Sequence, residues 1–119
     1  MGYIFDIDDE TVWSPSLRVG QLYVNLAEAA AHTLELPTGL EAVAEDMCDI
    51  NASVFSDFTR ALVKEFFSSH HAVAQEMLRG VLFASLIMLQ RGGIEITPHG
   101  EEQKSLWLTL PEFAQRMPT

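Results

Sequence analysis

Four acidic side chains near the start of the chain are the first residues whose types could do chemistry. They are Asp6, Asp8, Asp9 and Glu10. Carboxylates this close together can bind a cation or, in an aspartate-nucleophile phosphohydrolase, attack a phosphate. Neither motif is complete, because Glu10 stands where the D-x-D-x-T signature requires Thr or Val, and Thr11 and Leu17 replace the Gly and the closing Glu of a calcium loop. We therefore predict solvated acids in a turn and no metal site, with a weak cation site as the open alternative.

The histidines and the single cysteine supply no catalytic set. His70 and His71 are neighbours, so on a helix they point in different directions, and neither belongs to an H-x-x-x-H pair. Cys48 has no histidine near it in sequence and is interpreted as a small buried apolar residue. We predict a protein that is not an enzyme and uses no cofactor. A metal-dependent hydrolase built from Asp6, Asp8 and a histidine is the least favoured hypothesis.

The charge of the chain is one-sided. The 119 residues carry a formal net charge of −10. The whole excess of negative charge lies in residues 1–57, which contain eleven acidic residues and one basic residue. A negative field of this kind repels nucleic acid and anionic lipid, and it attracts a basic protein surface. We therefore expect a basic protein partner and neither nucleic acid nor a membrane. The acids proposed to bind this partner are Asp6, Asp8, Asp9, Glu10, Glu45, Asp46 and Asp49.

Residues 72–90 predict the central helix of the fold. From Gly80 to Leu89 only Ser85 interrupts an apolar run. A membrane span needs about 20 apolar residues, and this run is about half as long. A helix that is apolar on all sides must be covered by the rest of the domain or by a second copy of the protein. Self-association through Gly80 to Leu89, as a homodimer or a larger homo-oligomer, is therefore the second hypothesis.

Around this helix the sequence predicts a single α+β domain, residues 1–119. An N-terminal and a C-terminal β-hairpin, separate or joined in one small antiparallel sheet, are expected to pack on three main helices. The first hairpin follows from the alternation at 3–7 and the β-rich run at 11–13. Ser14 and Pro15 are expected to open the first helix. The remaining segments are a loop at 40–51, a helix at 52–67, strands at 94–97 and 105–109, and a short helix at 111–117.

Two tryptophans fall in the predicted strands. Trp13 and Trp107 each stand near a turn, and packing in the core or on the sheet is the default for both. Either one, if it is exposed, becomes a candidate aromatic anchor for the partner.

Three motifs carry a resemblance to a known family. The chain has T-x-W-x-P-S at residues 11–16, L-x-L-P-x-G at 34–39, and an acidic segment around Cys48 at 45–50. With these motifs it resembles, over roughly residues 3–91, a family of small actinobacterial proteins of unknown function. The resemblance implies an α+β fold and assigns no catalytic residue.

The leading hypothesis for function is an acidic protein-binding module. Such a module neutralises a basic partner, as an immunity or inhibitor protein does for a toxin or an enzyme. A homo-oligomeric structural or scaffold protein is the alternative. One cysteine cannot form an intrachain disulfide, which fits a reducing cytoplasm as the location.

Overall fold

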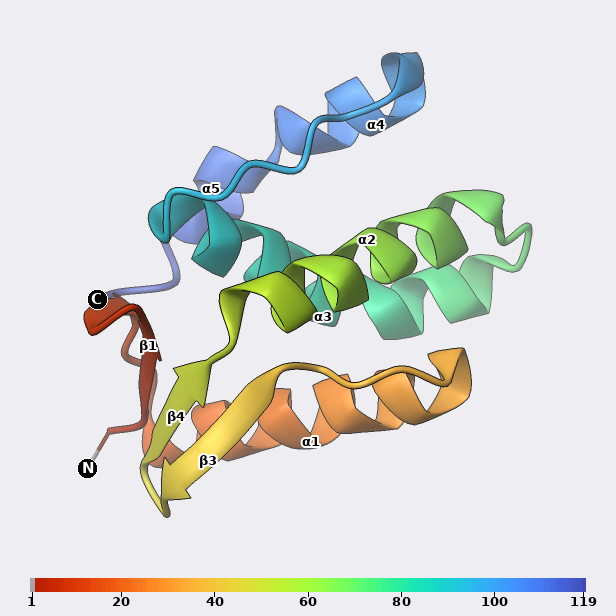
Figure 1. The fold of residues 1–119 in the computed structure, drawn as a ribbon. Coiled ribbons are helices and arrows are strands. Elements are labelled where there is room, and N and C mark those ends of the chain that lie inside the picture. The colour runs from red at the N-terminus through yellow and green to blue at the C-terminus, as the bar shows by residue number, and fades with distance from the viewer. Residues whose placement is uncertain (1) are drawn as a thin grey trace.

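The computed structural model describes residues 2–119 and has the α+β fold expected from the sequence. A small four-stranded sheet lies at one end of the molecule, and the helices extend away from it (Figure 1). The strands are β1 (Ile4–Ile7), β2 (Glu10–Trp13), β3 (Leu40–Ala44) and β4 (Met47–Ile50). The helices are α1 (Leu17–Leu34), α2 (Ala52–Ser68), α3 (Ala72–Arg91), α4 (Gly100–Trp107) and α5 (Leu110–Ala114).

The sheet joins two hairpins side by side in the order β2-β1-β4-β3. Each hairpin is antiparallel, but the two inner strands, β1 and β4, run parallel. Alternation along these strands puts Phe5, Ile7, Cys48 and Ile50 on the face that packs into the core. The sheet is therefore mixed, and not antiparallel throughout as in the joined arrangement that the sequence left open.

A serine cap fixes where α1 begins. The Oγ of Ser16 accepts a hydrogen bond from the backbone N–H of Val19 at 3.3 Å. Ser14, the expected cap, instead donates its backbone N–H to the carbonyl of Pro118, close to the other end of the chain. Helix α1 consequently begins at Leu17, two residues later than the sequence predicts.

The C-terminal half of the central helix α3 is surrounded by the rest of the chain. All nine residues from Val81 to Leu89 are buried, and β2, α1, α2 and α5 all contact the helix. The chain itself thus covers this run, which corrects the expectation that a second copy associates through Gly80 to Leu89. By length and composition α3 is the one helix within residues 2–119 that could cross a membrane, and half of its apolar window is buried inside the fold, as in the core helix of a soluble protein.

One polar residue lies in this buried run and is fully bonded. The Oγ of Ser85 lies 2.6 Å from the carbonyl of Val81, to which it donates, and 2.7 Å from the hydroxyl of Tyr23 on α1. Burial raises the pKa of Tyr23 above its ordinary value, so the phenol stays protonated and can donate to Ser85. This pair therefore fixes α1 against α3 at one point of an otherwise apolar contact.

The predicted loop at 40–51 is wrong, because this segment forms the hairpin of β3 and β4. Ala44 pairs with Met47 across a turn made by Glu45 and Asp46. Strand β4 has only four residues, and its inner edge is completed by β1 from a distant part of the chain. Pairing between segments so far apart leaves no signal in a local window of sequence.

The predicted C-terminal hairpin is also wrong. Residues 94–97 form neither helix nor strand, and residues 105–107 belong to α4. Glu101, Glu102, Gln103 and Lys104 are good helix formers, which outweigh the short β-rich run that follows them. The two segments still meet, because the indole N–H of Trp107 donates to the carbonyl of Ile96 at 2.9 Å.

Two helical glycines should respond in opposite ways to the same substitution. A Cβ on Gly20 would overlap the Cβ and Cγ of Tyr3, whereas a Cβ on Gly80 meets nothing within 4 Å. We expect Gly20→Ala to destabilise the protein by about 1–3 kcal/mol through overpacking. Gly80→Ala should stabilise it by roughly 1 kcal/mol, because alanine has less backbone conformational freedom than glycine to lose when the chain folds. Urea unfolding of both variants checks this, and a loss of stability in both would contradict the packing described.

Candidate functional site

A row of three carboxylates crosses the outer face of the sheet. Asp6 on β1 is paired with Asp49 on β4, and Asp49 is paired with Glu41 on β3. Paired residues on neighbouring strands point to the same face, and such strands lie about 4.8 Å apart. We call Asp6, Asp49 and Glu41 the carboxylate row. On β2 the row ends at Thr11, whose hydroxyl donates to Oδ1 of Asp6 at 2.8 Å.

The carboxylate row faces solvent. Asp49 and Glu41 are exposed and Asp6 is partly exposed, whereas the residues next to them in sequence on β1 and β4 point into the core. Ile4, on the same side of β1 as Asp6, is 39% exposed. This face of the sheet therefore offers a surface that a partner can reach.

The remaining predicted acids flank the row at both ends of the sheet. Asp8 and Asp9 form the β1–β2 turn with positive φ angles of 50° and 66°, a conformation that Asp tolerates better than most residues. Glu45 and Asp46 form the β3–β4 turn. Because β1 and β4 run parallel, one turn follows the end of β1 and the other precedes the start of β4, so the two turns lie at opposite ends of the sheet.

None of these sheet acids has a basic partner in the described part of the chain. The ion pairs there join residues three apart on one helix, and all are exposed. They are Arg60–Asp57 at 3.6 Å, Arg79–Glu76 at 3.8 Å and Lys104–Glu101 at 3.8 Å. The negative charge of the sheet is therefore uncompensated within residues 2–119.

The fold separates the residues of the hydrolase hypothesis. His70 and His71 lie in the connection between α2 and α3, at the end of the molecule opposite the sheet that carries Asp6 and Asp8 (Figure 1). Across residues 2–119 no group of three His, Cys, Asp or Glu side chains is placed to hold a metal ion.

The two tryptophans differ in their exposure. Trp13 is only 6% exposed, and its ring stacks on Phe5 with centroids 5.2 Å apart. Its indole N–H is buried and has no hydrogen-bond acceptor among the described residues. Trp107 is half-buried, with its N–H bonded to Ile96. Trp13 is therefore too buried to anchor a partner, whereas Trp107 keeps part of its surface exposed.

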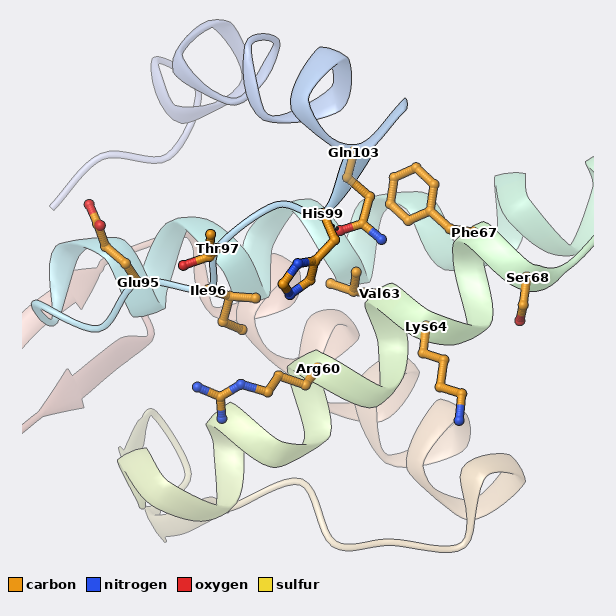
Figure 2. A pocket seen from close by; sticks show the side chains of 10 residues that line it. All are labelled: Arg60, Val63, Lys64, Phe67, Ser68, Glu95, Ile96, Thr97, His99 and Gln103. Carbon is orange, nitrogen blue, oxygen red and sulfur yellow. Dashed lines mark hydrogen bonds between the residues drawn. The ribbon is translucent and has the colours of Figure 1, made fainter. Parts of the chain in front are cut away.

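A cleft of about 660 Å³ lies between α2 and the segment that leads into α4. Val63, Phe67 and Ile96 contribute apolar surface to it, and Arg60 and Lys64 of α2 stand at its rim. Figure 2 shows the imidazole of His99 reaching toward α2 from the opposite side of the cleft. Glu95 adds a carboxylate to the same lining, so the cleft carries charges of both signs.

Sequence reasoning missed two parts of these sites. Glu41 falls in the segment taken for a loop, so nothing indicated its pairing with Asp49. His99 is isolated in sequence from Arg60 and Lys64, and only the fold brings the three together. In both cases the missing information is a contact between distant segments.

The fold and its surfaces define a small α+β domain with an open acidic sheet face. The chain belongs to a family of unknown function, DUF6086, whose model matches residues 1–119. No curated protein and no solved structure matches the chain. The resemblance to a family of unknown function, seen in the sequence, is confirmed.

The buried thiol of Cys48 should be inert in the folded protein. Its side chain is fully buried, and burial raises the pKa of the thiol to about 12. A thiol-specific reagent at pH 8 should therefore modify Cys48 only after unfolding. In the unfolded chain the thiol ionises near pH 9, so folding should also lose stability between about pH 9 and 12. Fast labelling of the native protein at pH 8 would contradict this burial.

Neutralising the carboxylate row should make the fold more stable. Like charges directly opposite each other on neighbouring strands repel. The triple variant Asp6→Asn, Glu41→Gln, Asp49→Asn should gain roughly 0.5 kcal/mol per removed repulsion at low salt, and the gain should shrink in high salt. Thermal unfolding at two salt concentrations measures both effects. A matched variant with the exposed helix acids changed, Glu65→Gln, Glu102→Gln and Glu112→Gln, should show little gain.

Proposed function

We propose that this protein is a non-enzymatic binding module that docks on a basic protein through the outer face of its sheet. The observation that carries the proposal is the carboxylate row of Asp6, Asp49 and Glu41, which is exposed and has no basic partner within the described chain. Three aligned carboxylates repel one another, and cationic groups of a partner relieve that repulsion. Binding of a basic partner therefore removes a repulsion that destabilises the free protein, and this relief adds to the free energy of association.

The rest of the sheet extends this surface. The acids of the two turns lie on either side of the row, at opposite ends of the strands, and a four-residue strand is about 13 Å long, so these charges are gathered on one small sheet. A long-range field of this kind accelerates the encounter with a basic surface. The basic side chains Arg60 and Lys64 are on α2 and form no ion pair with the acids of the sheet within the described chain.

The class of partner that fits is a basic toxin or enzyme. An immunity or inhibitor protein acts by covering a cationic active surface, which requires dense negative charge and no chemistry of its own. The acidic face meets the first requirement. The single buried thiol supports a cytoplasmic location, where such a protein protects the cell that makes it.

A deca-arginine peptide serves as a probe of the acidic face. We expect the peptide to bind the protein with an affinity that falls steeply as salt is added, because exposed charges are screened. The triple variant Asp6→Asn, Glu41→Gln, Asp49→Asn should lose roughly tenfold or more in affinity. Fluorescence anisotropy with a labelled peptide measures both quantities.

The control has the same charge and a different location. The triple variant Glu65→Gln, Glu102→Gln, Glu112→Gln also removes three exposed negative charges, but all three lie on helices. It should lose no more than about threefold in affinity, through the change in net charge alone. Equal losses in the two variants, or binding that does not respond to salt, would exclude the sheet face as the docking site.

A further inference from the structure

Helix α1 has two apolar faces, and only one of them is used inside the chain. The inner face contributes Gly20, Tyr23, Ala27, Ala30 and Ala31 to the core. The second face is exposed along its whole length, and its residues recur at alternating spacings of three and four. Its members are Val19, Leu22, Leu26, Ala29 and Thr33. This spacing is that of a helix seam that packs against another helix.

The seam borders an apolar groove between α1 and α3. Two hollows, of about 440 and 530 Å³, lie along it and share Leu26, Met77 and Val81 in their linings, so they adjoin each other along the groove. Val19, Leu22, Leu26 and Met77 are 46%, 55%, 47% and 73% exposed. They are half of the eight large exposed hydrophobic side chains in residues 2–119, so the apolar surface is concentrated here.

The groove is nearly neutral, in contrast to the rest of the surface. No charged residue belongs to the seam, and the charged residues of the lining are Glu76, Arg116 and Glu65. A chain of net charge −10 repels its own copies everywhere that its acids are exposed. A neutral apolar face is where two copies can approach, whereas a basic partner gains nothing there.

We propose that a second copy of this chain docks in this groove, with the α1 helices of the two copies packed against each other in an antiparallel pair. A two-fold axis uses the same patch on both copies, which suits a seam beside a groove. The N-terminus of α1 lies at the sheet and its C-terminus lies at the far end of the molecule (Figure 1). Antiparallel packing keeps the two acidic sheets apart, whereas parallel packing brings them together.

The oligomeric state tests the proposal. Sedimentation velocity at about 10–100 µM should show a dimer for the native protein, and the variant Leu22→Glu, Leu26→Glu should be a monomer with an unchanged circular dichroism spectrum, because it buries four unpaired charges in the dimer. Leu108→Glu is the control: Leu108 is 83% exposed and lies outside the groove, so this variant should remain a dimer. A native protein that is monomeric at 100 µM overturns the proposal, as does a variant Leu22→Glu, Leu26→Glu that still dimerises.

Crosslinking tests the antiparallel arrangement. Asn25 is exposed beside the seam at the middle of α1, whereas Arg18 lies at its start. In an antiparallel pair the two copies of residue 25 lie near the two-fold axis, and the two copies of residue 18 are about 20 Å apart along the helices. A short bis-maleimide should therefore crosslink Asn25→Cys but neither Arg18→Cys nor the native protein. Crosslinking of both variants indicates a parallel pair, and crosslinking of neither in a dimer excludes α1 packing; both outcomes overturn the proposal.

Dimerisation and docking on a basic partner use different surfaces, so their failures can be told apart. The variant Leu22→Glu, Leu26→Glu leaves the carboxylate row untouched and should still bind the deca-arginine peptide. The variant of the carboxylate row should still dimerise.

Discussion

The need to cover α3 on every side decides how the rest of this protein is arranged. Nine consecutive buried residues, Val81–Leu89, leave no side of the C-terminal half of this helix free for solvent. One layer of structure cannot enclose a helix, so β2, α1, α2 and α5 each take a part of its surface. The single hydroxyl in the run, on Ser85, is held by hydrogen bonds to Val81 and Tyr23, so that no polar group is left unpaired there. Arg91 completes the enclosure, because its guanidinium donates to the carbonyls of Val12 and Ala114 at 2.9 and 3.1 Å and ties β2 and α5 to the end of α3.

The parts of the fold that sequence predicts well are those with a local pattern. The helical repeat of α2, the apolar run of α3 and the first hairpin with its acidic turn all have their signal within a few neighbouring residues. The hairpin of β3 and β4 escaped prediction, because four-residue strands with exposed acids do not show a clear alternation, and β4 depends on β1 for its inner pairing. The predicted strand at 105–109 failed for the opposite reason, since local helix formers at 101–104 decide the conformation and Trp107 packs as part of α4. The acidic character of the site was visible in composition, but Glu41 and the alignment of the row required the sheet register.

Charge and apolar surface are divided among separate elements. The sheet carries the uncompensated acids, the rim of the cleft beside α2 carries Arg60 and Lys64, and the seam of α1 carries no charge. Each surface can therefore be changed without disturbing the other two. An antiparallel dimer through α1 would present its two acidic sheets at opposite ends, and a partner with two basic patches could then be held by both.

The parallel pairing of β1 with β4 sets the order in which the parts of the sheet can form. Phe5 of β1 pairs with Cys48 of β4, and β2, α1 and β3 lie between the two strands in the sequence. Until these two strands pair, the early strands have an unpaired inner edge and apolar side chains without cover. Pairing between segments this far apart is slower than formation of the local hairpins, so we expect closure of the sheet between β1 and β4 to limit the rate of folding.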